Sequence, residues 1–205
     1  MLEYVSSMTE TTSLNARIAD RVRELRTARG LSLDALATRT GVSRSMISLV
    51  ERGESSPTAV VLEKLSVGLS VPLASLFDAP AGDDALPSGP VARRIDQPEW
   101  RDPASGYLRR NVSPSGVGQP FQIVEVEFPP RARVAFESGS RDVRVDQQVW
   151  VLEGSIEVTW GDERFRLREG DCLAMQLDRP IMFHNATRKP ARYAVILASE
   201  PPPRR

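Results

Sequence analysis

The chain changes its hydrophobic period once, and this change limits the structures that it can form. Between residues 15 and 77, apolar residues recur every three or four positions, as on one face of an α-helix. Beyond residue 120 they alternate with polar residues in runs of strand length, separated by turns such as "GDER" and "REGD". The segment "DAPAGDDALPSGP" at 78–90 has neither period. The sequence therefore predicts an α+β protein with a helical domain followed by an all-β domain.

Two folded domains are expected between short tails. The polar segment at 1–14 lacks a sustained period, so it is predicted to be a flexible tail. The helical domain then covers 15–78, a linker 79–91 and the β domain 92–198, with a second tail at 199–205. The length of 205 residues is compatible with two such domains.

The composition limits the cellular location and the kinds of partner that are expected for this protein. One cysteine, Cys172, cannot form an intramolecular disulfide, and we expect it to be buried at the start of a strand. No apolar run has the length of a signal peptide or a membrane span. A cytoplasmic protein with no membrane partner is therefore expected. The 27 basic and 27 acidic residues leave no net charge, so any nucleic-acid site must be a local face.

Breakers and capping residues divide the helical domain into five predicted helices. Glycine readily ends a helix, serine caps the start of one, and proline is tolerated in the first turn. Two short helices joined by a tight turn at Gly41 make a helix-turn-helix. The dividing residues are, in chain order, Gly30, Ser32, Gly41, Ser43, Pro57 and Pro72.

The stretch "LSLDALATRTGVSRSMISLVERGESSPT" resembles the phage-repressor type of helix-turn-helix, the XRE family, with the likeness extending over residues 17–77. The small Ala37, Gly41 of the turn, Ile47 and the "ERG" loop all fall at the spacings of that family. The resemblance implies a transcriptional regulator that binds double-stranded operator DNA through the third predicted helix.

The residues predicted to meet DNA surround the starts of the second and third helices. Arginine can hold guanine in a bidentate way, short hydroxyl groups suit base edges, and free backbone N–H groups at helix starts bind phosphates. Residues 15–80 have nine basic and seven acidic side chains, a net charge of only +2. One copy should therefore bind weakly, and a homodimer is expected. The predicted DNA-binding residues are Ser32, Ser43, Arg44, Ser45, Ser48 and Arg52.

Short alternating runs predict that the second domain is an antiparallel β-barrel of the jelly-roll kind. Residues 121–198 resemble a cupin domain, through "VWVLEGSIEV" and "LREGDCLAMQLDRPIMFHN". A helix-turn-helix followed by a cupin implies a bacterial regulator. The predicted strands are "FQIVEVEF", "QQVWVLEG", "SIEVTW", "RFRLR", "CLAMQL", "IMFHN" and "RYAVILA".

The metal ligands of metal-binding cupins are replaced in this chain. Those cupins carry a His-x-His pair and a glutamate in the first motif and a histidine in the second. Here the pair falls on "SGSRDV" at 138–143, the glutamate on Gln147 and the last histidine on Ile181. The single histidine, His184, is predicted by strand alternation to point away from the lumen. No metal, cofactor or catalytic residue is therefore expected, since a two-His-one-carboxylate iron site needs two histidines.

Three alternatives remain open. Glu137, Asp142 or Asp146 could build an oxygen-only site for Ca²⁺ or Mg²⁺. The protein could be an enzyme that resembles the hydroxypropylphosphonate epoxidases, which share this layout and use a mononuclear iron, although the missing histidines disfavour it. The lumen could also be filled by its own side chains.

Strand alternation instead favours an apolar lumen that binds a small organic effector. The homodimer is expected to form mainly through the β domains, so that paired recognition helices meet an inverted-repeat operator. The residues predicted to line the ligand pocket are Gln147, Val149, Val151, Ile181 and Phe183.

Overall fold

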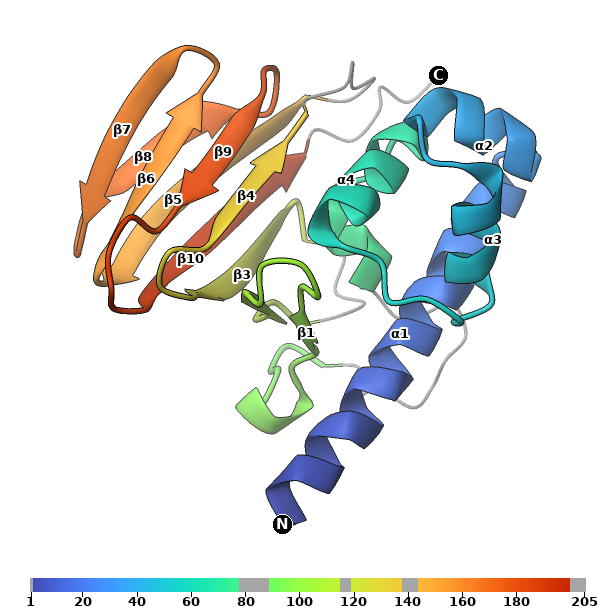
Figure 1. Ribbon diagram of the computed structural model, residues 1–205, viewed down its shortest axis with the longest axis horizontal. Coiled ribbons are helices and arrows are strands. Elements are labelled where there is room, and N and C mark those ends of the chain that lie inside the picture. Colours follow the sequence, from blue (N-terminus) through green and yellow to red (C-terminus); the bar gives the residue numbers. More distant parts are fainter. Residues whose placement is uncertain (1, 78–88, 115–118, 138–143, 200–205) are drawn as a thin grey trace.

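The computed structural model describes residues 2–77, 89–114, 119–137 and 144–199, with side chains described from residue 14 to residue 198 of these. A helical domain lies beside a β domain made of two sheets (Figure 1). Most of the predicted linker, 79–91, falls outside the described residues, as do residues 200–205 of the predicted second tail.

Four α-helices and one 3-10 helix form the helical domain. The predicted fifth helix is wrong as an α-helix, because residues 73–77 form the 3-10 helix η1. Ser70 has a φ of 51° and Pro72 follows it, so α4 cannot continue into this segment and a new turn begins at Leu73. The elements are α1 (Leu2–Ala28), α2 (Leu33–Thr40), α3 (Arg44–Glu51), α4 (Ala59–Gly68) and η1 (Leu73–Phe77).

The first helix is longer than the sequence indicates. It begins at Leu2, where a flexible tail over 1–14 is expected. Residues 1–29 contain neither proline nor glycine, so no residue type stops the helix from extending toward the amino terminus. Leu14 is buried against the helical core and therefore belongs to the folded domain.

Both predicted caps of the helix-turn-helix are confirmed. The Ser32 hydroxyl accepts a hydrogen bond from the Ala35 amide at 3.1 Å, and the Ser43 hydroxyl accepts one from the Met46 amide at 3.2 Å. Gly41 has a φ of 66°, the left-handed conformation that glycine adopts without strain. These local signals fix the turn between α2 and α3.

The β domain is a sandwich of two antiparallel sheets. The first sheet has the order β1-β2-β3-β10-β5-β8, and the second has the order β4-β9-β6-β7. The strands are β1 (Glu99–Arg101), β2 (Leu108–Asn111), β3 (Phe121–Phe128), β4 (Arg133–Phe136), β5 (Val145–Glu153), β6 (Ser155–Trp160), β7 (Glu163–Arg168), β8 (Cys172–Gln176), β9 (Ile181–His184) and β10 (Ala191–Ser199), with the 3-10 helix η2 (Arg94–Asp96) before β1.

The antiparallel pairing is confirmed, whereas the closed barrel is wrong. Within the described residues, β1 and β8 are the edges of the first sheet, and β4 and β7 are the edges of the second. Side chains from the two inner faces close the interior by packing, as in other sandwiches, so a continuous ladder of strands is not needed. All seven predicted strands form, and β1, β2 and β4, of three or four residues each, were not predicted.

The two domains meet at a junction that we define by Ala59, Phe77, Trp100, Asp102 and Arg109. The Asp102 carboxylate, which follows β1, accepts a hydrogen bond at 2.9 Å from the backbone amide of Ala59, the first residue of α4. The rings of Phe77 and Trp100 meet edge to face with centroids 5.7 Å apart. The guanidinium of Arg109 lies 5.1 Å from the Phe77 ring centre. The β domain thus caps a helix of the other domain.

We predict that Asp102→Ala lowers the free energy of unfolding by about 1–2 kcal/mol, because it leaves the buried amide of Ala59 without its acceptor. Urea unfolding followed by circular dichroism measures this change. Asp96→Ala, at an exposed carboxylate of η2, is the control and should leave the midpoint unchanged. Equal midpoints for the two variants would contradict a capping role.

Candidate functional site

The start of α3 presents the predicted base-reading side chains to solvent. Arg44 and Ser45 are exposed and Ser48 is half-buried, while Ile47 and Val50 on the other face of α3 are buried. Ser43 is exposed at the cap of the same helix. The helical period thus separates a packed face from a polar face whose donors are available to a partner.

Carboxylates hold both predicted DNA-binding arginines in the free protein. Arg44 Nε lies 3.2 Å from Asp34 Oδ1, between two exposed side chains. Arg52 donates two hydrogen bonds of 2.8 Å to the Glu54 carboxylate and a further one to the Ser48 hydroxyl. The hydrogen bonds from Arg52 also lower the pKa of the Glu54 carboxyl. The guanidinium of each arginine is therefore already engaged by a carboxylate, which any other anionic or hydrogen-bonding partner would have to replace.

Sequence reasoning missed these two carboxylates. Asp34 lies in the first turn of α2, where an acidic residue is ordinary because it favours the helix dipole. Glu54 lies in the loop after α3, where no helical spacing links it to Arg52. The small net charge of this domain follows from the sequence. Which carboxylate pairs with which arginine depends on the fold.

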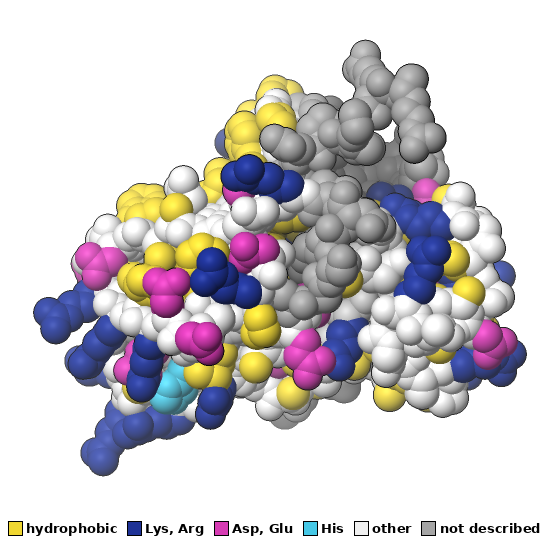
Figure 2. Space-filling view, turned by 90° about the horizontal axis from the view of Figure 1, so that it is seen from above, with side chains coloured by type: hydrophobic (Ala, Val, Ile, Leu, Met, Phe, Trp, Pro, Cys, Tyr) yellow, Lys and Arg dark blue, Asp and Glu magenta, His cyan; other side chains and the backbone are white. Residues whose placement is uncertain are grey.

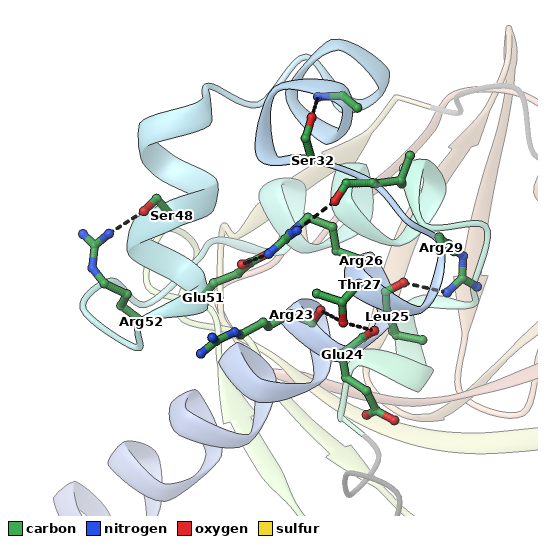
Figure 3. Close-up of polar contacts among 12 residues, drawn as sticks. Arg23, Glu24, Leu25, Arg26, Thr27, Arg29, Ser32, Ser48, Glu51 and Arg52 are labelled. Carbon is green, nitrogen blue, oxygen red and sulfur yellow. Dashed lines mark hydrogen bonds and ion pairs between the residues drawn. The ribbon is translucent and has the colours of Figure 1, made fainter.

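A largely buried ion pair connects α3 to the rest of the domain. Arg26 of α1 donates to both oxygens of Glu51 at 2.6 and 2.8 Å, and it also donates to the Leu31 carbonyl at 2.8 Å (Figure 3). The two charged side chains are only 14% and 7% exposed. The pair joins α1, the turn before α2 and the end of α3. Its members are 25 residues apart, so no local pattern predicts it.

A cavity of about 80 Å³ lies inside the β domain and reaches the helical domain. Gln147, Ile181 and Phe183 line it, as expected for inward-facing positions. Val149 and Val151 also face inward and are fully buried, but they are not among the lining residues. At that end of β5 the interior is therefore filled by side chains, so the predicted pocket holds only three of its five residues.

Three further parts of the cavity wall were not predicted. Tyr107 and Arg109 come from the region of β2, which is too short to be recognised as a strand. Glu63 comes from α4, where a glutamate is normally a solvent-facing residue but here is 4% exposed. Leu73, with Pro72 before it, completes the wall from the start of η1. Each of these positions depends on the packing of one domain against the other.

The predicted orientation of His184 is confirmed. Ile181 and Phe183 of β9 are buried, while His184 lies on the outer face of the four-stranded sheet. There its Nδ1 lies 3.1 Å from Glu157 Oε2, and Arg164 donates to the same oxygen. These hydrogen bonds, from Arg164 first and then from His184, lower the pKa of the Glu157 carboxyl. Figure 2 shows lysine and arginine side chains gathered around the histidine.

The carboxylates considered for an oxygen-only metal site have other partners. Glu137 lies 3.1 Å from the ammonium of Lys64, and Asp146 lies 3.1 Å from the guanidinium of Arg144. Asp142 lies outside the described residues. No group of three or more His, Cys, Asp or Glu side chains that could hold a metal ion occurs in the described part of the chain. Cys172, expected to be buried, is exposed because it lies on the outer face of the edge strand β8.

Residues 22–76 match the family model HTH_3, described as Helix-turn-helix. The HTH-type transcriptional regulator SutR of Escherichia coli is 42% identical over 71 residues, which are 35% of this chain and 39% of that protein. The HTH-type transcriptional regulator SinR of Bacillus subtilis is 37% identical over 62 residues, which are 30% of this chain and 56% of that protein. The chain thus matches less than two thirds of either relative.

A solved structure resembles the chain over both domains. It is an HTH_3 family transcriptional regulator from Vibrio cholerae, with 27% sequence identity and a TM-score of 0.73, covering 94% of this chain and 99% of that one. In the residues that the structure describes, no helix is both long and apolar enough to cross a membrane. The family match, the two serine caps and the glycine turn agree on one assignment. Residues 22–76 of this chain are thus similar to the HTH_3 family of helix-turn-helix domains.

Proposed function

We propose that the chain is a sequence-specific DNA-binding transcriptional regulator and that α3 is its recognition helix. The observation that carries the proposal is the exposed start of α3, where Arg44 and Ser45 stand beside the capped helix end in a domain that is similar to the HTH_3 family. Backbone N–H groups at the starts of α2 and α3 would hold phosphates and set the register. The side chains of α3 would then read base edges in the major groove.

Asp34 and Glu54, which pair with the two arginines, would help this surface to distinguish the matching DNA sequence from others. A phosphate group offers Arg44 or Arg52 roughly the same contact on any sequence, and it must replace Asp34 or Glu54 to do so. A matching base adds a bidentate hydrogen bond that a wrong base does not supply. The carboxylates therefore weaken binding to all DNA sequences. Only the matching sequence offsets this weakening, through its additional bidentate hydrogen bond. This is specificity through an unfavourable contact with the wrong partner.

We predict that Arg44→Ala weakens binding to a selected operator by about 1–3 kcal/mol and relaxes the preference at one base position. Arg52→Ala should weaken binding to all sequences alike, because a phosphate contact carries no sequence information. Asp34→Asn should tighten binding, since it releases Arg44 and removes a negative charge. Mobility-shift titrations measure all three, with Arg94→Ala on the exposed face of η2 as the control. Equal affinities of wild type and Arg44→Ala for selected operators would refute the assignment.

A homodimer through the β domains is part of the proposal. The outer face of the six-stranded sheet exposes Trp150 by 47% and Phe121 by 44%. Between them lie Ala194, Ile196 and Ile123, which are cross-strand neighbours on the same face. An apolar face of this kind on a soluble protein marks an interaction site. A second copy fits it, because one helical domain with a net charge of +2 would bind DNA weakly alone.

We predict that Trp150→Asp converts a dimer into a monomer, because it replaces the most exposed ring of the apolar face with a charge. Light scattering measures the mass, and Ile95→Asp, at a 93% exposed position in η2, is the control. Cys172 lies directly across from Trp150 on the neighbouring strand, so a short bifunctional thiol reagent should cross-link wild-type dimers through it. A wild-type protein that stays monomeric alone and on DNA would remove the dimer from the proposal.

The cavity is proposed as the site of a small organic effector that controls operator affinity. Its wall is largely apolar, and such a wall gains from displaced water but cannot replace the hydration shell of a metal ion. An effector that favours one arrangement of the helical domains would shift operator affinity by about 1–3 kcal/mol.

A further inference from the structure

Arginine side chains gather on the outer face of the four-stranded sheet. Side chains alternate along a strand, so the residues next to the buried positions of each strand point outward. In the four strands of this sheet, all of which the structure describes, Glu157 is the one acidic residue that points outward. Four arginines and this carboxylate give the face a net charge of +3 before His184 is counted, whereas the whole chain has none. The outward arginines, all of them exposed, are Arg133 of β4 and Arg164, Arg166 and Arg168 of β7.

Two of these arginines have no carboxylate beside them. Arg166 lies directly across from Glu157 in the register of β6 and β7. The Glu157 carboxylate, however, accepts a hydrogen bond from Arg164, and the His184 ring lies 3.1 Å from the same oxygen. Within the described residues, the guanidinium groups of Arg166 and Arg168 have no hydrogen-bond or ion-pair partner. Two positive charges, two residues apart on one strand, are therefore available to an anionic partner.

The strand β7 is also an edge of its sheet. In an antiparallel pair, only every second residue turns its backbone N–H and C=O toward the neighbouring strand. The Glu169 amide donates to the Gly154 carbonyl at 3.1 Å, which places these two residues in a hydrogen-bonded pair. Counted from this pair along the register, Arg164, Arg166 and Arg168 turn their backbone groups away from β6. The residues with the outward charges thus also present the backbone groups of the free edge.

Asp171 agrees with this direction, because it bonds to the outward backbone groups of Arg168. The Asp171 carboxylate accepts from the Arg168 amide at 2.8 Å, and the Asp171 amide donates to the Arg168 carbonyl at 2.9 Å. The backbone groups of Arg164 and Arg166 remain, and no strand in the described part of the chain lies beside them. They form a short open edge that offers both donors and acceptors.

An acidic polypeptide strand fits both the charges and the open edge. An added strand satisfies N–H and C=O groups alike, whereas the phosphates of a nucleic acid accept hydrogen bonds but donate none to a C=O group. In an antiparallel pair the residue opposite each arginine lies on the same face, with Cα atoms about 5.5 Å apart, so an acidic side chain there meets the guanidinium. A second copy of β7 would instead set arginine against arginine, and like charges directly opposite repel each other.

We propose that β7 binds an acidic segment of another protein, which adds to the sheet as an antiparallel strand with carboxylates at alternate positions. The arginines select the acidic strand, and the backbone groups of Arg164 and Arg166 hold it in register. The strand β7 and the helix α3 lie at opposite ends of the molecule (Figure 1), so this surface stays open whether or not α3 contacts DNA. The proposal does not rest on the proposed function above.

Fluorescence anisotropy on the full-length protein tests the charges with three labelled octapeptides. In the first, glutamate and threonine alternate. The second has the same composition, but its glutamates stand in adjacent pairs, so that no two of them are two residues apart. In the third, lysine and threonine alternate. We expect the first to bind at least fivefold more tightly than either of the others. Equal binding of the first two would show attraction by net charge alone and would overturn the proposal, as would no saturable binding of the first at millimolar concentration.

Two N-methylated forms of the alternating acidic peptide test the backbone contacts. In the antiparallel pair, the N–H groups that bond to β7 belong to the glutamates, which lie opposite the arginines, and the threonine N–H groups point away. N-methylation of the glutamates should therefore abolish binding, whereas N-methylation of the threonines should preserve it. Equal affinities of the two methylated peptides would mean that the edge of β7 is not used, and strand addition would be wrong.

Protein variants locate the binding site. The double variant Arg166→Ala, Arg168→Ala should bind the alternating acidic peptide at least tenfold more weakly, because it removes the two unpaired charges. Arg101→Ala, which removes an exposed arginine from the edge strand β1 of the other sheet, is the matched control and should bind as wild type does. Circular dichroism checks that the variants are folded, and if they are not, the methylated peptides decide on the unaltered protein. Unchanged affinity in the folded double variant would refute the assignment to β7.

A nucleic acid is the competing occupant, and a labelled single-stranded DNA of mixed sequence tests it. We expect the double variant to bind this probe as wild type does. If the double variant loses affinity for the single strand and keeps its affinity for the peptide, the surface is a nucleic-acid site and the proposal is wrong. Failure of the wild-type protein to bind any duplex operator would count against the proposed function and not against the surface on β7.

Discussion

The hydrogen bond between the Asp102 carboxylate and the amide of Ala59 sets the relation between the two domains. It lies in a buried place, so an amide left without an acceptor there would be costly, and the carboxylate also adds a negative charge at the start of α4. Phe77 and Trp100 exclude water beside it. Because the β domain supplies this cap, α4 cannot move far from the sheets without losing it. The cavity wall formed by α4 depends on the same constraint.

A second constraint acts within the helical domain. The pair of Arg26 with Glu51 holds α1 against the end of α3, while the start of α3, which we propose to contact DNA, is exposed. Buried pairs of this kind contribute more to a defined geometry than to stability when they are compared with apolar packing. At the exposed end, Asp34 and Glu54 keep the arginines occupied until a better partner replaces them. The buried ion pair thus holds the packed side of the domain, while the ion pairs of Arg44 and Arg52 on the exposed side can be replaced by other contacts.

Local chemistry was predictable from the sequence, and long-range packing was not. Ser32, Ser43 and Gly41 act through bonds to residues three or four positions away, so their pattern is visible in the chain itself. Strand alternation likewise placed Ile181 and Phe183 inside and His184 outside. Glu63 was missed because a glutamate on a helix ordinarily faces water, and only the neighbouring domain makes it a wall residue. The expected closed barrel failed for a similar reason, since alternation gives the face of a strand but not its partner.

We propose that the junction makes the two domains one cooperative unit, so that a ligand in the cavity would affect the surface proposed to bind DNA. Differential scanning calorimetry of the full-length protein tests this coupling. We expect one unfolding transition whose calorimetric and van't Hoff enthalpies agree. Two resolved transitions, one for the helical domain and one for the β domain, would contradict it.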